Sequence, residues 1–144
     1  NEAVIGKGVP ARPFKMHILG DGQKILDFSG DGIIIATPTG STAYSMSAGG
    51  PIVEPTGKNI VLTPICAHSL TAMPFVLRSD RHIVAEIGNI EGKAANLSID
   101  GSVEVELRQG DLVRINESKY ITRLVRVVNR SFYEIVNSKL NSDF

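Results

Sequence analysis

Short runs of strand-forming residues, each closed by a turn signal, fill most of this 144-residue chain. Residues 14–18 alternate apolar and polar side chains, a pattern typical of a strand that is buried on one face. The Gly-Asp-Gly at 20–22 predicts a hairpin turn into a strand over 24–28. Further strands are expected over 32–36, 59–63, 82–87, 96–99, 103–107, 112–115 and 121–128. Strands that recur every ~8–12 residues predict a mostly-β fold, an antiparallel sandwich or a relative of it.

Two segments predict helix. Residues 41–48 are rich in small side chains, and residues 131–140 begin with Ser131 and Glu134 in the spacing of a capping box. No linker, internal repeat or low-complexity tract divides the chain, and its length suits one domain over 1–144. The expected fold class is therefore mostly β, antiparallel and sandwich-like, with one or two short helices.

Composition excludes several classes of protein. Lys plus Arg and Asp plus Glu number 15 each, which weighs against a nucleic-acid partner because such partners select basic surfaces. No apolar run approaches the ~20 residues that span a membrane. The single Cys66 cannot form an internal disulfide and favours a cytoplasmic location. With no His–acid pair placed beside it by the sequence, Cys66 is expected to be a small packed residue.

Residues 31–51 carry the densest chemistry. Six of them are Ser or Thr, Ser29 precedes them, and they follow an apolar run that is expected to be buried on both faces. Gly40 permits a tight turn, after which Ser41 or Thr42 could cap the short helix and leave N–H groups free for a polar ligand. Tyr44 offers a flat face to a base or a nicotinamide ring. A capped helix docked on a strand, with Tyr44 in the core, explains the same residues equally well.

The same stretch resembles the NAD kinase family, the inorganic polyphosphate/ATP-NAD kinases. That family carries Asp-Gly, an apolar run, Thr-Pro-Thr-Gly-Ser-Thr-Ala-Tyr-Ser, one residue and Ser-Ala-Gly-Gly-Pro, as residues 31–51 do here. The resemblance continues at 62–70, 100–101 and 139–140, and reaches back to the Asn-Glu pair at 1–2. It therefore covers the chain from end to end.

The resemblance implies a site for NAD. Asn1 and Glu2 correspond to the pair that hydrogen-bonds the adenosine ribose, and Asp31 to the aspartate at the nicotinamide end. Residues 42–47 correspond to the run that lines the dinucleotide site, while Ser102 stands where many relatives carry a longer amide side chain. The full implied set is Asn1, Glu2, Ser29, Asp31, Thr42, Ala43, Tyr44, Ser45, Met46, Ser47, His68 and Ser102. Without the resemblance, Asn1 and Glu2 would be interpreted as a strand start and His68 as an ordinary loop histidine.

The resemblance also implies what this chain lacks. The Gly-Asp-Gly at 30–32 superficially matches the phosphate loop of the superfamily, but its spacing from residues 37–40 assigns it to the NAD side. In the family, the Gly-Gly-Asp-Gly motif lies upstream of the Asn-Glu pair, so the N-terminal α/β nucleotide-binding domain is expected to be absent. No catalytic residue and no metal ligand is predicted here. ATP or polyphosphate, with Mg²⁺ or another divalent metal, would bind through the missing domain, and the chain alone is expected to be inactive.

The implied function is the NAD-binding and oligomerisation domain of an ATP-dependent NAD kinase, working as a homodimer or homotetramer. The full enzyme would phosphorylate the 2′-hydroxyl of the adenosine ribose and make NADP. Two alternatives stay open: the C-terminal domain of a related lipid or sphingoid kinase, and a non-catalytic module that senses NAD. The hydroxyl-rich run favours NAD, because a lipid site should be more apolar.

Overall fold

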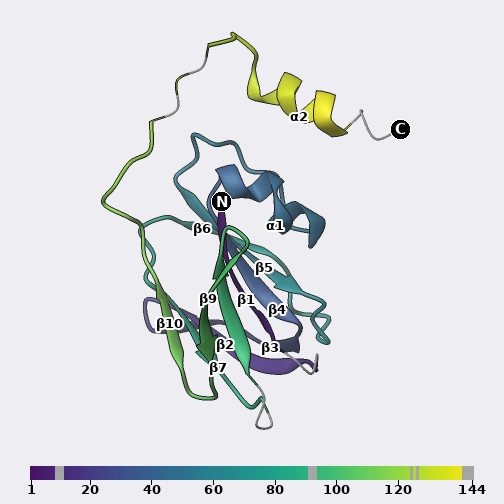
Figure 1. Ribbon diagram of the computed structural model, residues 1–144, viewed down its shortest axis with the longest axis vertical. Coiled ribbons are helices and arrows are strands. Elements are labelled where there is room, and N and C mark those ends of the chain that lie inside the picture. Colours follow the sequence, from purple (N-terminus) through teal and green to yellow (C-terminus); the bar gives the residue numbers. More distant parts are fainter. Residues whose placement is uncertain (9–11, 91–93, 124, 126, 141–144) are drawn as a thin grey trace.

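Two antiparallel sheets make up the body of the molecule (Figure 1). The computed structural model describes residues 1–8, 12–90, 94–123, 125 and 127–140. In the larger sheet the order is β6 (Phe75–Arg78), β5 (Asn59–Ile65), β4 (Gly32–Ala36), β1 (Glu2–Lys7), β8 (Ala95–Ile99) and β9 (Ser102–Leu107). In the smaller sheet it is β10 (Leu112–Ile115), β7 (Ile83–Ile87), β2 (Phe14–Gly20) and β3 (Gln23–Gly30). The expected mostly-β antiparallel fold is confirmed.

The core lies between the two sheets. Phe14, Met16 and Ile18 of β2 are at most 3% exposed, as the alternation over 14–18 predicts. They pack in one cluster with side chains of the larger sheet, among them Ile5 and Leu62. Face-to-face packing of this kind defines a β-sandwich.

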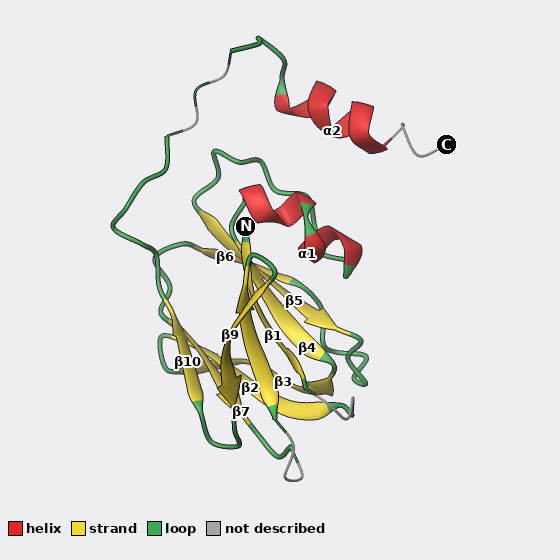
Figure 2. Cartoon of the chain, in the orientation of Figure 1, coloured by secondary structure: helices red, strands yellow, loops and turns green. Residues whose placement is uncertain are grey.

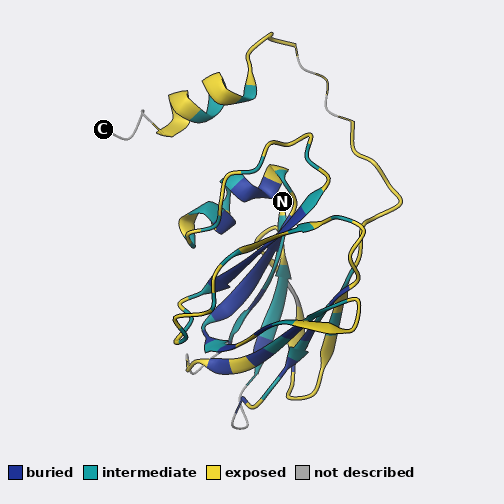
Figure 3. Ribbon diagram, turned by 180° about the vertical axis from the view of Figure 1, so that it is seen from behind, coloured by how far each residue is buried: buried dark blue, intermediate teal, exposed yellow. Residues whose placement is uncertain are grey.

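Strand β4 is buried on both faces, as its unbroken apolar sequence predicts. Ile33 and Ile35 point into the main core, whereas Ile34 and Ala36 belong to a second cluster on the opposite face. Figure 3 shows the buried residues in dark blue along the central strands of the larger sheet. The second cluster includes Ala48, so it lies beneath the short helical segment that follows β4.

Asp31 is the only residue between β3 and β4, and there the chain passes from the smaller sheet to the larger. Strand β1 pairs antiparallel with β4, with Glu2 opposite Ala36 and Gly6 opposite Gly32. Residues that follow β4 therefore meet the beginning of β1, while Asp31 meets the end of β1.

The helices are η1, a 3₁₀-helix over Thr39–Thr42, and the α-helices α1 (Tyr44–Ser47) and α2 (Phe132–Leu140). In α2 the expected capping box is confirmed, since the Ser131 N–H donates to Glu134 Oε2 at 2.7 Å and the Glu134 N–H donates to Ser131 Oγ at 3.2 Å. The single helix expected over 41–48 is wrong: the backbone breaks at Ala43, where φ is −101° and ψ is −129°. None of the helices in the described ranges is long and apolar enough to cross a bilayer.

Other expectations fail as well. The strand expected over 121–128 does not form among the described residues there, and Leu124 and Arg126 lie outside them. The described residues between β10 and α2 form an extended arm that leaves the sandwich after β10 and leads to α2 (Figure 2). Its β-forming composition does not suffice because a strand needs a neighbour to receive its backbone hydrogen bonds. Cys66 is exposed rather than packed, and strand β6 was not predicted. Strand β1 begins at Glu2, which agrees with the interpretation of Asn1 and Glu2 as a strand start.

Candidate functional site

The turn after β4 is held by hydroxyl groups, but not by the caps that the sequence suggests. Neither η1 nor α1 has a side-chain cap, so the expectation that Ser41 or Thr42 caps a helix is wrong. Ser41 is fully buried, its hydroxyl donates to the Pro38 carbonyl at 2.6 Å, and it accepts the Val53 N–H at 3.0 Å. Its bonds tie the turn to the loop before β5, which is why the hydroxyl cannot also serve as a cap.

Ser45 fixes α1 to the larger sheet. Its hydroxyl is fully buried and lies 2.8 Å from the hydroxyl of Thr63 on β5. A Cβ added at Gly50 would meet both of these hydroxyls, so a side chain there would separate the pair. Part of the hydroxyl-rich run is therefore engaged within the protein, facing the sheet.

Other residues of the run face outward. Tyr44 is 46% exposed, which rules out its core placement. Ser47 is exposed, whereas Thr42, Ala43 and Met46 are half-buried. The Thr42 hydroxyl donates only a long bond, 3.4 Å, to the Thr39 carbonyl. The outer surface of η1 and α1 thus presents hydroxyl groups and an aromatic ring that a ligand could contact.

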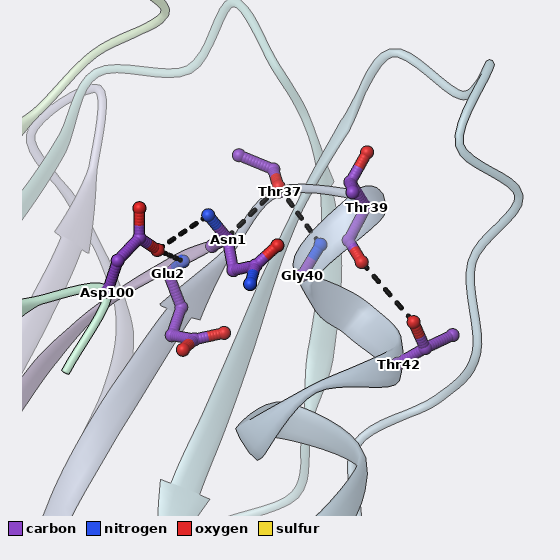
Figure 4. A network of polar contacts seen from close by, with 7 residues as sticks. All are labelled: Asn1, Glu2, Thr37, Thr39, Gly40, Thr42 and Asp100. Carbon is purple, nitrogen blue, oxygen red and sulfur yellow. Dashed lines mark hydrogen bonds and ion pairs between the residues drawn. The ribbon is translucent and has the colours of Figure 1, made fainter. Parts of the chain in front are cut away.

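A hydrogen-bonded cluster joins this turn to the beginning of β1 (Figure 4). Thr37 donates to the Asn1 carbonyl twice, from its N–H and from its hydroxyl, each at 3.0 Å. The same hydroxyl accepts the Gly40 N–H at 3.1 Å. From the β8–β9 turn, Asp100 Oδ1 accepts bonds from the backbone nitrogens of Asn1 at 2.6 Å and Glu2 at 3.1 Å. Those bonds, led by that from Asn1, hold the pKa of the Asp100 carboxyl below its ordinary value.

Glu2 stands out within this cluster. Its side chain points away from Asp100 (Figure 4), and Oε2 is buried with no hydrogen-bond partner among the described residues. A cavity of about 440 Å³ lies beside it, lined also by Asn1, Pro38 and Asp100. A buried carboxylate oxygen without a donor is costly, so a donor from outside the described residues would stabilise this atom.

The remaining expected residues fall elsewhere. Lys7, at the end of β1, places its Nζ 2.7 Å from Asp31 Oδ2, and its N–H donates to the Asp31 carbonyl at 2.9 Å. The His68 N–H donates to the Ser29 carbonyl at 2.8 Å, which holds the exposed His68 beside the same crossing. We call Lys7, Ser29, Asp31 and His68 the crossing cluster.

We call Asn1, Glu2, Thr37 and Asp100 the Asn1–Glu2 cluster. This cluster and the crossing cluster lie at opposite ends of β4. Six residue steps separate Asp31 from Thr37, a span of about 20 Å in an extended strand. Ser102 is exposed at the beginning of β9, where it pairs with Ile99 two residues from Asp100, and so lies near the Asn1–Glu2 end. Within one chain, the structure divides the expected NAD residues between two places.

Sequence reasoning missed three residues of these clusters. Thr37 lies inside the motif and could have been found from it, because a Thr before Pro-x-Gly often bonds the turn that follows. Asp100 lies in the part of the resemblance at 100–101, but its contact with Asn1 spans almost the whole chain. Nothing in the sequence around Lys7, a single charged residue before a glycine, indicates its contact with Asp31. Among the described residues, no group of three or more His, Cys, Asp or Glu could hold a metal ion.

Comparison with known proteins identifies the family. The sequence model of the ATP-NAD kinase C-terminal domain matches residues 1–127. The chain belongs to this family. It is 40% identical to an NAD kinase of Citrifermentans bemidjiense over 140 residues, which are 97% of this chain and 49% of that protein. It is 41% identical to an NAD kinase of Symbiobacterium thermophilum over 141 residues, which are 98% of this chain and 50% of that protein. The chain thus spans about half the length of these relatives.

Solved NAD kinase structures share the fold. Yeast NADH kinase complexed with NADH superposes with a TM-score of 0.76 and 40% identity, covering 83% of this chain and 34% of that one. An NAD kinase from Archaeoglobus fulgidus in complex with ATP superposes with a TM-score of 0.72 and 29% identity, covering 83% and 45%. These relatives are NAD or NADH kinases. They support the C-terminal domain of an NAD kinase over the two alternatives, the C-terminal domain of a lipid kinase and a module that senses NAD.

Proposed function

We propose that this chain is the NAD-binding part of an ATP-dependent NAD kinase, which transfers a phosphoryl group to the 2′-hydroxyl of the adenosine ribose and forms NADP. The observation that carries the proposal is the buried Glu2 Oε2 beside Asn1, which has no hydrogen-bond partner in the part of the chain that the structure describes. A ribose presents vicinal hydroxyls, and a carboxylate next to an amide can accept from one and donate to the other. Phosphoryl transfer depends mainly on position and charge, so holding this ribose still is a direct contribution to the reaction.

The outward surface of η1 and α1 would hold the rest of the dinucleotide. Thr42 and Ser47 offer hydroxyl groups, and the exposed ring of Tyr44 can stack on a base or on nicotinamide. Asp31, oriented by Lys7, would contact the nicotinamide amide with Ser29 and His68 beside it. Ser45, being buried against Thr63, would act through the position of α1 and its backbone.

The half of the relatives that this chain does not span would supply ATP or polyphosphate, the divalent metal and the base. The metal, Mg²⁺ in the simplest case, would neutralise phosphate charge there. A cytoplasmic location, expected from the single cysteine, is part of the proposal.

Assembly into a homodimer or homotetramer is also proposed. The Asn1–Glu2 cluster and the crossing cluster lie about 20 Å apart along β4. A second copy can bring its crossing cluster to the Asn1–Glu2 cluster of the first, so that both groups act on one NAD molecule. Equal numbers of basic and acidic residues leave little net repulsion between copies.

Titration calorimetry of Glu2→Gln tests the proposed function. Removing the carboxylate charge should weaken NAD binding by ~1–3 kcal/mol, because a charge-assisted bond to the ligand is lost. The melting temperature should stay the same or rise, because a buried unpaired charge is removed. Thr42→Val should weaken NAD binding without unfolding the chain.

The matched control is Glu86→Gln, the same change on the smaller sheet, which should leave NAD affinity unchanged. NADP and a lipid serve as competing ligands in the same experiment. Tighter binding of the lipid than of NAD, or equal NAD affinity in Glu2→Gln and Glu86→Gln, would contradict the proposal.

A further inference from the structure

The crossing between the two sheets contains a shielded ion pair. Lys7 Nζ lies 2.7 Å from Asp31 Oδ2, and the two side chains are 30% and 24% exposed. The other ion pairs that the structure describes are all more exposed; the side chains of Lys24 and Asp27, for example, are 69% and 39% exposed. Water and salt screen a partly buried pair less than a surface pair, so its charges act more strongly on a ligand placed beside it.

The backbone already holds Asp31 in place. Its N–H donates to the Ile65 carbonyl and its carbonyl accepts the Lys7 N–H, each at 2.9 Å. The next residue, Gly32, lies so close to β1 that an added Cβ would overlap the Ile5 carbonyl. Contacts with β5 on one side and β1 on the other therefore fix Asp31 without the Lys7 side chain. What the Lys7 ammonium adds to this position is mainly charge.

The ligand expected beside Asp31 exists in two charge states. This inference rests on the proposed function, in which Asp31 contacts the nicotinamide end of the dinucleotide. The oxidised ring of NAD carries one positive charge, whereas the reduced ring of NADH is neutral. The rest of the two molecules is identical, so the ratio of their affinities reports on the surroundings of the ring.

An unpaired carboxylate at this position would favour the oxidised ligand. The attraction between two opposite charges falls only with the inverse of their distance, and it is stronger in a partly buried site than in water. An ammonium 2.7 Å from the carboxylate cancels the net charge and leaves a dipole, whose field falls off faster. The paired Asp31 therefore gives the charged ring little advantage over the neutral one.

The fold by itself does not select the redox state of the ligand. The solved relatives that share the sandwich include a yeast NADH kinase complexed with NADH and an NAD kinase from Archaeoglobus fulgidus. One fold is thus common to kinases named for the reduced and for the oxidised dinucleotide. Side chains at the nicotinamide end must then set the preference of each protein.

We propose that Lys7 is a specificity-determining residue, whose ammonium neutralises Asp31 and so lets the nicotinamide end of the site accept NAD and NADH alike. Lys7 acts on the ligand through the charge of Asp31. A site that kept Asp31 without the ammonium would select the oxidised form. A site that kept the ammonium without the carboxylate would select the reduced form.

The ratio of the dissociation constants of NADH and NAD tests this proposal. Both ligands are titrated into the 144-residue chain by calorimetry at about pH 8, above the range in which histidines ordinarily titrate, because His68 lies in the same cluster. The parent chain should bind the two ligands within about threefold of each other. Lys7→Met, which keeps the length of the side chain but not its charge, should raise the ratio by at least about threefold.

The charge of the carboxylate gives the opposite shift. Asp31→Asn should lower the ratio by at least about threefold, because the Lys7 ammonium is then unpaired beside the ring. The double variant Lys7→Met/Asp31→Asn should return the ratio to that of the parent, even though both ligands lose a contact with the carboxylate. A structural role of Lys7 would move the two affinities together and would not produce shifts of opposite sign.

Two further variants serve as controls. Lys7→Arg keeps a positive charge beside Asp31 and should keep the parent ratio. Lys24→Met removes the charge from the Lys24–Asp27 pair on the smaller sheet and should leave the affinity for each ligand unchanged. An unchanged ratio in Lys7→Met, or an equal shift in Lys7→Met and Lys7→Arg, would overturn the proposal. So would loss of both ligands in Lys7→Met, because Lys7 would then be needed for binding and not for discrimination.

Glu2→Gln separates failure of this inference from failure of the proposed function. If Glu2→Gln weakens the binding of both ligands while Lys7→Met leaves their ratio unchanged, the NAD site stands and the role of Lys7 is refuted. If Glu2→Gln leaves both affinities unchanged, the proposed function fails and this inference falls with it.

Discussion

Close contacts between single residues hold the turn after β4 against the start of β1. Gly40 in η1 lies so near the backbone of Asn1 that a Cβ there would overlap the Asn1 carbonyl. That carbonyl accepts both bonds from Thr37, so its position fixes the start of β1 against the turn. The motif glycine is therefore needed for a close approach between segments far apart in the sequence.

Gly40→Ala should destabilise the chain by about 1–3 kcal/mol, because backbone atoms cannot move aside as a flexible side chain can. Urea unfolding measures the effect. Gly6→Ala is the matched control: Gly6 is in β1 with no atom within 4 Å of an added Cβ, so its stability should be unchanged or slightly raised. Equal midpoints for the two variants would mean that the contact at Asn1 is looser than the structure has it.

At the scale of elements, the two helical segments follow different rules. Helix α2 was predicted from its residues because its capping box is a local signal: both bonds join positions three apart. The break between η1 and α1 was not predicted, because it depends on bonds between distant residues. Ser41 bonds to Val53 and Ser45 bonds to Thr63, and no local pattern identifies these partners. Tertiary bonds thus divert the hydroxyls that would otherwise cap a continuous helix.

Acidification should melt α2 before the sandwich. The Ser131 N–H and hydroxyl hold the pKa of Glu134 below its ordinary value of 4.5. A lowered folded-state pKa contributes stability that is complete above the unfolded value and is lost as the pH falls through the folded value. Hydrogen exchange of residues 132–140 should therefore speed up as the pH falls below about 4.5, after correction for the intrinsic pH dependence of exchange.

Glu134→Gln is the control for that prediction, since the amide oxygen can still accept the Ser131 bond but does not titrate in this range. Its corrected exchange should be independent of pH between about 3 and 6. The same acceleration in Glu134→Gln would assign the effect to another group.

Across the whole molecule, the sandwich offers a hydroxyl-rich surface at one end and a buried carboxylate oxygen of Glu2 that has no partner among the described residues. In the proposed function, NAD would engage both.

The purified 144-residue chain should form no measurable NADP from NAD with ATP or polyphosphate, with or without Mg²⁺. The physical reason is that Asp31 is paired with Lys7 at the crossing, about 20 Å from the Asn1–Glu2 cluster, and so cannot serve as the base for the ribose in the same chain. An enzymatic assay for NADP checks this. Turnover that disappears in Asp31→Asn would show that the Gly-Asp-Gly at 30–32 is a catalytic motif after all.

The sequence by itself determined whatever depends on neighbouring residues. The alternation over 14–18, the apolar run over 32–36, the hairpin at 20–22 and the capping box of α2 each act within a few positions, and the structure has all of them. The family resemblance likewise follows from one contiguous motif. These features could be predicted because period, turn chemistry and capping are local properties of the backbone.

Only the tertiary structure decided where these parts meet. The antiparallel register of β1 on β4 brings Asn1 to Gly40 and Lys7 to Asp31, so the expected site residues are divided between two ends of one strand. The same structure leaves the described residues between 121 and 128 without a strand partner, although the composition of this stretch favours a strand. Register and partnership depend on contacts between residues far apart in the chain, and no local pattern carries that information.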